Sequence, residues 1–520
     1  MSEIVTPEWV KHAVFYQIFP DRFARSGRVA GAAKLEPWDT EPTERGYKGG
    51  DLWGVVERLD HLQDLGVTAL YFNPVFQSAS NHRYHTHDYF RIDPLLGGDE
   101  AFDALLAECR RRGLRVVLDG VFNHCSRGFF QFNDVLENGA ASPWVDWFTF
   151  TGHPANAYDH SRPPGYAAWW GLHALPKFDT ANPAVREFLM SVGEYWIRRG
   201  IDGWRLDVAP WLPHGFWKHW RRTVKAINPE AYLVAENIRD VAFNIPFLQG
   251  DEFDAVMNYN FAFACDEFFF RERTRITASR FDALLRELRE AYPACVAPVM
   301  QNLFGSHDTA RLASHAFNRD RLDYRAFDET YHPRDSRAPL LDTRRPDAHA
   351  RALQRLFVLF QMTHLGAPMV YYGDEAGLWG ANDPCCRKPM LWPELAYEAE
   401  AADPAGGPRA EAQPVAFDPA LFDHYRRCIA LRHALPVLRT GTVETLLADD
   451  ARQLLVHRRR DDAMQAIVAI NRSEAAQRIV LDGVTATGWR DRWNGGASLD
   501  AEDAQLALTL PPLSGAVLVA

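Results

Sequence analysis

Four acidic residues stand at the ends of short apolar runs in this sequence: Asp119, Asp207, Glu236 and Asp308. Carboxyl groups that meet in one site can serve as nucleophile and as proton donor, so these residue types suit covalent and acid–base catalysis. A single Asp after a strand is more often a helix cap than a catalyst. Four acids in order, each ending its own apolar run, are a more specific signal.

The phrases around these acids carry further polar side chains. They read DGVFNH from residue 119, GWRLDVA from residue 203, VAEN from residue 234 and FGSHDT from residue 304. Residues two apart on a strand face the same way, so we expect Arg205 to lie beside Asp207 and to keep it ionised.

The chain that must position these acids alternates apolar runs with helical patterns. The eight strand candidates are residues 13–19, 67–73, 114–119, 201–206, 232–235, 253–259, 296–303 and 368–372. Continuous apolar strands separated by helices indicate a parallel sheet that is covered on both faces. Eight of them predict an α/β fold of the (β/α)8 TIM-barrel type, in which catalytic residues lie at the carboxyl ends of the strands.

Helix signals lie between these strands. Asp51, Asp99 and Asn182 are placed to cap helices that run to residues 65, 112 and 199, and a glycine follows each of the three. An acidic or amide cap at the start and a glycine at the end are the usual boundaries of a helix.

Three segments interrupt the alternation. Residues 124–179 are aromatic and rich in Pro and Gly, and they predict an excursion domain after the third strand. Residues 312–347 are polar with little periodicity, and residues 399–413 have the composition of a flexible surface loop or linker. Loops of this length are usually functional or mobile.

The end of the chain has a different pattern. Four short strand candidates, at residues 453–457, 466–470, 506–510 and 516–519, predict an antiparallel β-sandwich domain. The predicted division therefore gives the barrel residues 1–123 and 181–438, the excursion domain residues 124–180 and the C-terminal domain residues 439–520.

Composition excludes several classes of protein. The 520 residues carry a net charge of −11, which offers no electrostatic footprint for nucleic acid or an anionic membrane. The seven scattered cysteines suit neither a disulfide framework nor a zinc site. The first residues lack a basic and apolar leader, and polar residues interrupt the apolar run 356–372, so we expect a cytoplasmic protein without a membrane span.

The acidic phrases together resemble glycoside hydrolase family 13, the α-amylase family, from about residue 14 to residue 471. Four more phrases are similar to the neopullulanase, cyclomaltodextrinase and maltodextrin-glucosidase group. They read YQIFPDRF from residue 16, SNHRY from residue 80, LPKF from residue 175 and DPCCRKPM from residue 383.

The resemblance implies a catalytic triad. Asp207 matches the nucleophile that forms a covalent glycosyl-enzyme, and Glu236 matches the general acid and base. Asp308 matches a third carboxylate, which binds sugar hydroxyls and favours the distorted transition state. Neighbouring carboxylates are expected to raise the pKa of Glu236, so that it starts protonated.

The resemblance also implies which side chains hold the sugar. The substrate-binding residues are His82, Tyr84, His124, Arg205, His307, Asp383 and Arg387, and the supporting residues are Asp119 and Asn123. Tyr84 matches an aromatic platform under the sugar that His124 and His307 bind. For Asp383 and Arg387, an ordinary surface ion pair at i,i+4 is an equal alternative.

The sequence departs from its relatives in several places. Residues 24–30 lack the Asn and Asp ligands of the relatives' calcium loop, so we expect no required cofactor, with calcium as the one candidate. Asn123 and Asp51 remain, but two ligands are not a site. The first strand begins near residue 13, so no N-terminal β-domain and no dimer built on one are expected, and the oligomeric state stays open. His85 and Asn237 replace an Asp and an Ile close to the substrate.

The expected function is retaining hydrolysis of α-1,4-linked gluco-oligosaccharides such as malto-oligosaccharides and cyclodextrins. Water and sugar compete for the same glycosyl-enzyme, so an α-glucosyl transferase or a glucoside-isomerising enzyme is the first alternative. A non-catalytic carbohydrate-binding barrel is the alternative from another class. Residues 312–347 follow the seventh strand, so we expect them to narrow the cleft and to favour short oligosaccharides over starch.

Overall fold

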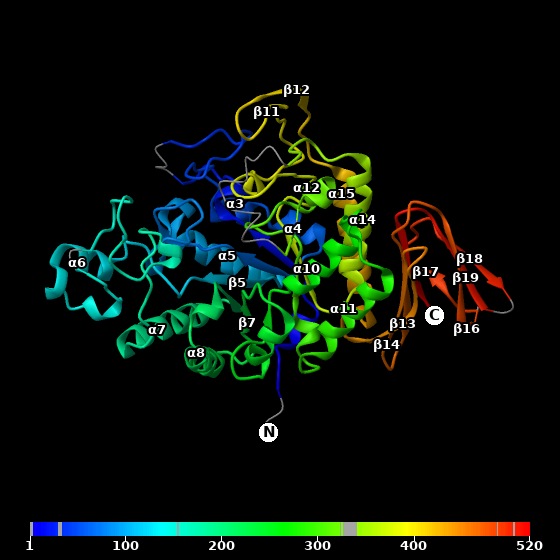
Figure 1. The fold of residues 1–520 in the computed structure, drawn as a ribbon, viewed down its shortest axis with the longest axis horizontal. Coiled ribbons are helices and arrows are strands. Elements are labelled where there is room, and N and C mark those ends of the chain that lie inside the picture. Colours follow the sequence, from blue (N-terminus) through cyan, green and yellow to red (C-terminus); the bar gives the residue numbers. More distant parts are fainter. Residues whose placement is uncertain are drawn as a thin grey trace.

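The computed structural model describes residues 4–29, 34–152, 155–322, 324–325, 341–485, 487–502 and 505–520. Its centre is an eight-stranded parallel barrel with helices around it (Figure 1). The strands are β1 (Phe15–Ile18), β2 (Ala69–Phe72), β5 (Arg115–Gly120), β6 (Gly203–Leu206), β7 (Tyr232–Ala235), β8 (Ala255–Val256), β9 (Gln301–Asn302) and β10 (Ala367–Tyr371). They are paired in the order β8-β7-β6-β5-β2-β1-β10-β9, and a bridge between Met257 and Gln301 closes the ring. The predicted barrel and its eight strand positions are confirmed.

Two of these strands are much shorter than predicted. The candidate at 253–259 contributes only two residues to β8, and the candidate at 296–303 contributes only two to β9. In the second case a 3-10 helix, Ala297–Val299, takes up the first half of the run. Pro298 has no N–H to donate to a ladder, so an apolar composition alone does not extend the strand.

Helices cover the outside of the barrel. The longer ones are α5 (Gly98–Arg112), α7 (Pro183–Arg199), α8 (His214–Ile227), α11 (Ala278–Glu290), α14 (Ala348–Thr363) and α15 (Pro419–Ala434). The apolar run at 356–372 is thus the end of α14 followed by β10. Among the described residues, no helix is long and apolar enough to cross a membrane.

The helix caps follow the prediction at two of three places. Asp51 accepts a hydrogen bond from the Gly54 N–H, and Asn182 accepts one from the Ala184 N–H. The predicted helix after Asp51 is in fact two, α3 (Leu52–Glu57) and α4 (Leu59–Leu65), because the chain leaves helical geometry at residue 58. Asp99 is not a cap: α5 begins one residue earlier, after Gly97, and the Asp99 carboxylate binds Arg199 instead.

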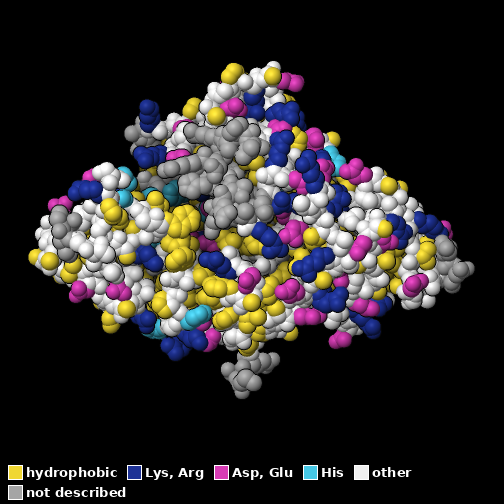
Figure 2. Space-filling view, viewed as in Figure 1, with side chains coloured by type: hydrophobic (Ala, Val, Ile, Leu, Met, Phe, Trp, Pro, Cys, Tyr) yellow, Lys and Arg dark blue, Asp and Glu magenta, His cyan; other side chains and the backbone are white. Residues whose placement is uncertain are grey.

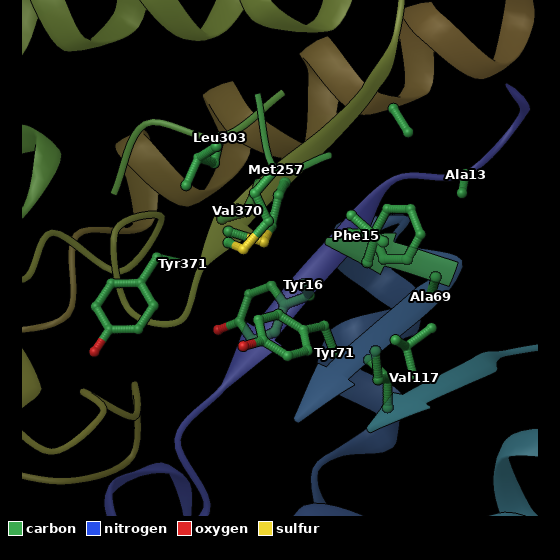
Figure 3. Close-up of a cluster of buried hydrophobic side chains, with 14 of the residues drawn as sticks. Ala13, Phe15, Tyr16, Ala69, Tyr71, Val117, Met257, Leu303, Val370 and Tyr371 are labelled. Atoms are coloured by element: carbon green, nitrogen blue, oxygen red, sulfur yellow. The ribbon is translucent and has the colours of Figure 1, made fainter. Parts of the chain in front are cut away.

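The barrel interior is apolar at one end and polar at the other. Figure 3 shows Phe15, Ala69 and Val117 packed together, with the hydroxyl groups of Tyr16 and Tyr71 pointing away from them. The Tyr71 hydroxyl donates to Asp119 at 2.7 Å, so the tyrosines connect the packed core to the carboxyl ends of the strands. This is the end at which the predicted site residues lie.

The excursion segment, residues 124–180, extends from the barrel after β5 (Figure 1, cyan, at the left). It contains α6 (Phe130–Asn138) and short 3-10 helices. Bridges between His124 and Lys177 and between Phe148 and Phe178 bring its two ends together. Both ends therefore return to the mouth of the barrel. The exact division of the chain into domains remains a prediction.

Two segments predicted as loops are more regular than expected. Residues 312–318 form α12 (Leu312–Asn318), most of whose side chains are buried, so the helix has no polar face to give a periodic signal. Residues 400–413 form the hairpin of β11 (Glu400–Ala402) and β12 (Pro408–Gln413). Its strands lack β-branched residues, and ion pairs from Lys388 and Arg409 to Glu400 hold it instead. Residues 326–340, the middle of the predicted cleft insertion, lie outside the described residues.

The C-terminal strands form the predicted β-sandwich. One sheet contains β13 (Thr442–Asp449), β14 (Leu454–Arg460), β15 (Gln465–Asn471), β17 (Arg490–Asp491) and β20 (Ser514–Val519). The other contains β16 (Gln477–Thr485), β18 (Ser498–Glu502) and β19 (Gln505–Leu510). Along β14, Leu454 and Val456 face the sandwich core, whereas Leu455 packs on the core of the barrel. Because successive side chains of a strand point to opposite faces, β14 packs against both cores and joins the two domains.

A lysine ammonium organises the loop after β1. Lys48 is completely buried, and its Nζ donates to the carbonyl oxygens of Pro37 and Thr40 at 2.7 Å and to the Thr40 hydroxyl at 2.8 Å. A carboxylate oxygen of Glu36 lies 3.5 Å away. The loop therefore folds around one internal positive charge, and Arg22 and Arg25 hold further carbonyl oxygens at Gly46 and Glu36.

We expect the substitution Lys48→Met to lower the free energy of unfolding by about 2–4 kcal/mol, because it leaves buried oxygen atoms without a donor. The measurement is urea denaturation followed by circular dichroism. Lys218→Met is the matched control, since Lys218 is half exposed and pairs with Asp251 at the surface. That variant should lose less than about 1 kcal/mol. Equal losses in the two variants would contradict the role of Lys48.

Candidate active site

The guanidinium of Arg205 is the centre of the site at the carboxyl end of the barrel. It is fully buried on β6. Its Nη1 atom lies 2.9 Å from an Asp119 oxygen and 2.8 Å from an Asp207 oxygen, and its Nη2 atom donates to Glu236. The structure thus brings three of the four predicted acids onto one cation. The predicted orientation of Arg205 beside Asp207 is confirmed.

Strand pairing sets the positions of these acids. Asp119 of β5 lies directly opposite Arg205 of β6 in the parallel register. The Asp207 N–H donates to the Gly120 carbonyl at 3.1 Å, and the Glu236 N–H donates to the Leu206 carbonyl at 3.0 Å. The ladder hydrogen bonds therefore continue past the ends of β6 and β7, and they fix the backbone of both acids.

The residue after Asp207 has an unusual backbone. Val208 has φ = 41°, in the left-handed region where a β-branched residue is strained. In this conformation its N–H donates to a Glu236 oxygen at 3.0 Å. Both Glu236 oxygens thus accept a hydrogen bond, one from Arg205 and one from the backbone beside Asp207. Nothing in the sequence indicated this turn.

A second polar network reaches the site from the opposite strands. The Tyr84 hydroxyl donates to Asp119 at 2.7 Å and lies 2.7 Å from His307 Nε2, and its ring stacks on the His307 ring at 5.3 Å. Gln17 Nε2 donates to His307 Nδ1 at 2.9 Å. Because Nδ1 accepts this bond, the proton of a neutral His307 is on Nε2, 3.0 Å from Asp308.

Asp308 lies at the entrance of the site. Its side chain is 29% exposed, and Arg387 approaches it at 3.5 Å. The same guanidinium binds Asp383 at 2.8 Å and the His307 carbonyl at 2.8 Å. The i,i+4 ion pair is present, but Arg387 is only 10% exposed, so the pair does not lie on the open surface. The pair joins the loop after β10 to the loop after β9.

The remaining predicted residues line the same end of the barrel. His82 Nδ1 accepts a hydrogen bond from the Tyr84 backbone N–H at 3.1 Å. His124 is buried, contacts the Asn123 side chain at 3.2 Å and stacks on Trp169. Every predicted site residue therefore lies at the carboxyl ends of the strands or in the loops that follow them.

Burial raises the pKa of Asp119 and raises that of Asp207 well above its usual range, and the charge of Glu236 adds to the shift of Asp207. The ion pair with Arg205 opposes both shifts. Arg205 favours the ionised form of Asp207, as expected, but this effect is smaller than that of burial, which favours the protonated form. Burial, followed by the charge of Glu236, raises the pKa of Asp308 to about 7.

The histidines of the site are neutral. Burial lowers the pKa of His124 to about 3 and that of His307 well below its usual range. Burial and the neighbouring His85 lower the pKa of His82 in the same way. Neutral imidazoles add no positive charge to the carboxylates and can both donate and accept hydrogen bonds.

Asp51 and Asn123, the two candidate calcium ligands, contact other protein groups in the structure. No group of three or more His, Cys, Asp and Glu side chains gathers among them as a metal would require. One Asp51 oxygen accepts from the Gly54 N–H and the other from the N–H and hydroxyl of Ser26. Asp51 therefore has structural partners on both oxygens, and Asn123 contacts His124.

Three polar residues of the site were missed from the sequence. Gln17, Tyr71 and Asn73 lie at or just past the ends of β1 and β2, and Asn73 Nδ2 donates to the Tyr84 hydroxyl at 3.1 Å. Polar residues at the end of an otherwise apolar run were the available signal. Asn237 is fully buried, and neither polar atom of its side chain has a hydrogen-bond partner in the structure.

The chain is similar to known proteins of one family. Residues 17–330 match the family model described as the alpha amylase catalytic domain. Neopullulanase 2 of Thermoactinomyces vulgaris is 38% identical over 99% of this chain and 79% of its own length. A cyclomaltodextrinase of Geobacillus thermopakistaniensis is 38% identical over 97% of this chain and 76% of its own length.

Solved structures extend the likeness to the whole fold. The debranching enzyme of Nostoc punctiforme superposes with a TM-score of 0.80 at 40% identity and covers all of both chains. The cyclic α-maltosyl-(1→6)-maltose hydrolase of Arthrobacter globiformis gives a TM-score of 0.80 at 35% identity, over 99% of this chain and all of that one. With the acids, the barrel and the matched catalytic domain in agreement, this chain belongs to the α-amylase family of glycoside hydrolases.

Proposed function

We propose that this enzyme hydrolyses α-1,4-linked gluco-oligosaccharides, such as malto-oligosaccharides and cyclodextrins, with retention of the anomeric configuration. The observation that carries the proposal is the shared guanidinium. Arg205 holds Asp207 and Glu236, from the ends of two adjacent strands, on one side of the barrel mouth. Two carboxyl groups close together are what a retaining mechanism requires.

In the first half-reaction Glu236 donates a proton to the leaving oxygen, and Asp207 attacks the anomeric carbon to form a glycosyl-enzyme. Burial is the main cause of the raised pKa of Asp207, and the charge of Glu236 adds to it. A proton on Glu236 removes that added repulsion, which favours the ionised form of Asp207 that attacks. One Glu236 oxygen exchanges its N–H partner for the leaving oxygen when substrate binds. In the second half-reaction Glu236 takes a proton from water, which displaces Asp207 from the sugar.

The other site residues bind the sugar. Asp308 accepts hydrogen bonds from hydroxyl groups, and Arg387 and Asp383 hold the non-reducing side. His82, Tyr84, His124 and His307 surround the reacting ring, as the resemblance implies. The contacts of Asp119 and Asn123, to Arg205 and His124 respectively, support positioning roles.

The bond type and the chain length of the substrate are further parts of the proposal. The likeness to an Arthrobacter cyclic α-maltosyl-(1→6)-maltose hydrolase favours testing α-1,6 bonds beside α-1,4 bonds. A preference for short oligosaccharides over starch stays a prediction, since the central part of the insertion at 312–347 lies outside the described residues. The intracellular maltogenic amylase of Bacillus subtilis is 38% identical over 74% of this chain, which favours a cytoplasmic location.

The triad is tested by two variants. Asp207→Asn should reduce turnover of maltotriose more than about 10³-fold while the protein stays folded, because no glycosyl-enzyme forms. Glu236→Gln should lose about 10²–10⁴-fold on maltotriose. On α-maltosyl fluoride its loss should be smaller, because fluoride leaves with little protonation. Proton NMR of the first product should show the α-anomer.

Asp146→Asn is a matched control, since Asp146 lies in the excursion segment away from Arg205, and it should keep parental turnover. Near-parental activity of Asp207→Asn would overturn the assignment of the nucleophile. An initial β-anomer would overturn the retaining mechanism, and equal losses of Glu236→Gln on both substrates would overturn the acid role.

Protonation of Asp308 should be visible as a pH-dependent stability. Its pKa of about 7 in the folded protein exceeds the value near 4 of an unfolded chain. Between about pH 4 and about pH 7 the folded state binds more protons at this position, so its contribution to stability falls as pH rises. Asp308→Asn removes this loss, and its melting temperature should exceed the parent's at pH 8 but not at pH 4. Asp251→Asn, at an exposed pair with Lys218, should show no such trend. A variant no more stable than the parent at pH 8 would contradict the shift.

We expect no metal requirement. Asp51 has hydrogen-bond partners on both oxygens, and the described residues hold no metal-binding cluster. Incubation with EDTA followed by gel filtration should leave the rate on maltotriose and the melting temperature within error of the untreated enzyme. A fall in melting temperature that calcium restores, and magnesium does not, would show that a calcium site exists.

A further inference from the structure

Asp308 is held in a different way from the other two acids of the proposed triad. The backbone N–H groups of Asp207 and Glu236 donate to carbonyl oxygens of the neighbouring strands. Asp308 instead lies in the turn between β9 and α12, and its N–H donates to the Ser306 hydroxyl at 3.2 Å. β9 contributes only two residues to the sheet, so the ladder ends before this turn. The position of Asp308 therefore depends on side-chain contacts of the turn.

The hydroxyl group of Tyr324 connects the two ends of this turn. It donates to the Phe304 carbonyl and hydrogen bonds to the Thr309 side chain. The Thr309 hydroxyl oxygen accepts from the Ser306 N–H at 3.1 Å. A chain of hydrogen bonds through Tyr324 thus joins the start of the turn to the residue directly after Asp308.

Tyr324 belongs to the base of the insertion, which comprises its described residues 312–322, 324–325 and 341–347. The Tyr324 ring is 1% exposed. It meets the rings of Phe263 and Phe304 edge to face at 5.7 and 5.1 Å, and the His315 ring lies 5.3 Å away. His315 is fully buried in α12, and its Nδ1 lies 3.1 Å from Asp266. A ring enclosed in this way has little freedom, so its hydroxyl stays directed at the turn.

Apolar side chains from both ends of the insertion pack on the same turn. Ala310 is completely buried against Leu322, and Leu341 packs on this pair from the other end of the insertion. The Asn318 side chain accepts from the Asp342 N–H at 2.7 Å and donates to the Asp342 carbonyl at 3.0 Å. The two ends of the insertion therefore meet, and they do so against the turn that carries the third acid.

The outer side of the base is charged. Arg319 pairs with Glu272, and Arg325 pairs with Glu267 at 2.5 Å. Figure 2 shows Lys, Arg, Asp and Glu side chains interspersed over the part of the surface that contains α10 (Tyr259–Cys265) and α11. None of the described residues of the base is a large hydrophobic side chain exposed to solvent. The apolar and hydroxyl contacts of the base are thus directed inward, at the turn of the third acid.

We propose that Tyr324 is a positioning residue, through which the base of the insertion holds the Asp308 carboxylate where it meets the hydroxyl groups of the reacting sugar. The inference rests on the proposed function, in which Asp308 accepts hydrogen bonds from the sugar, and it deepens that function. Tyr324 is buried, so it does not itself contact the sugar and acts through Asp308. This part of the insertion thus serves the reacting ring and is indifferent to the length of the sugar chain.

The test measures sugar binding by isothermal titration calorimetry in an Asp207→Asn background, in which no glycosyl-enzyme forms and the sugar stays intact. Adding Tyr324→Phe removes one hydroxyl group and keeps the ring. The dissociation constant of maltotriose should rise about three- to tenfold, which is the effect of one lost hydrogen bond. Maltoheptaose should show the same factor, because the change lies at the reacting ring.

A double-mutant cycle with Asp308→Asn shows whether Tyr324 acts through this carboxylate. Asp308→Asn alone should weaken maltotriose binding. Tyr324→Phe added to it should change the dissociation constant less than about twofold, because the group that it positions is absent. Thr309→Val breaks the same chain of hydrogen bonds and should match Tyr324→Phe, whereas Thr309→Ser keeps the hydroxyl and should bind as tightly as the background.

Tyr232→Phe is the matched control. Tyr232 is also fully buried, and its hydroxyl donates to the Val299 carbonyl at 2.7 Å. It stands at the start of β7, whereas the acids lie at the carboxyl ends of the strands. Tyr232→Phe and Tyr324→Phe should lower the melting temperature by similar amounts, because each deletes one buried hydrogen bond. Only Tyr324→Phe should weaken sugar binding.

The outcomes separate this inference from the proposed function. A parent enzyme that does not hydrolyse maltotriose, or an Asp308→Asn variant that binds it as tightly as the background, would overturn the proposed function of the site and the inference with it. Weaker binding in Asp308→Asn together with unaltered binding in Tyr324→Phe would overturn the inference alone. So would an equal loss in Tyr232→Phe, a full loss from Tyr324→Phe in the absence of the Asp308 carboxylate, or a loss confined to maltoheptaose.

Discussion

One buried guanidinium organises the catalytic end of this barrel. Arg205 has no exposed surface, and a charge in that position is tolerated only when partners surround it. Its partners come from three adjacent strands: Asp119 from β5, Asp207 after β6 and Glu236 after β7. The requirement to compensate this charge fixes the relative heights of the strands, and it places the two acids of the proposed mechanism together.

The same requirement extends the network across the barrel. Asp119 accepts hydrogen bonds from Tyr71 and Tyr84, and Tyr84 contacts His307, which Gln17 holds from β1. Side chains from opposite strands are thus linked through hydrogen bonds to the group that orients Asp207. The acids carry more negative charge than Arg205 and Arg387 neutralise, and burial together with the charge of Glu236 raises the pKa of Asp308 to about 7. That surplus of negative charge destabilises the folded protein, and an active site can retain such a cost for its function.

The sequence allowed the barrel, the four acids and the polar residues beside them to be predicted, because each acid ends an apolar run and the family phrases have fixed spacing. Features that depend on contacts with distant parts of the chain could not be predicted from the sequence. The short strands β8 and β9 have apolar neighbours that form other structures, and α12 is buried on most sides and shows no periodicity. The strain at Val208 was invisible because the backbone conformation there follows from contacts with β7.

Burial also divides the site into a buried part around Arg205, where substitutions are costly, and an exposed part at the barrel mouth, where residues can change. Around Arg205 every substitution would leave a charge or a hydrogen-bond donor without its partner, so the first half-reaction admits little change. Trp170 is 66% exposed and Trp211 53% exposed, so side chains at the rim of the mouth are under no comparable constraint. Residues at this rim can therefore change while the carboxylates that break the bond in the proposed mechanism keep their partners.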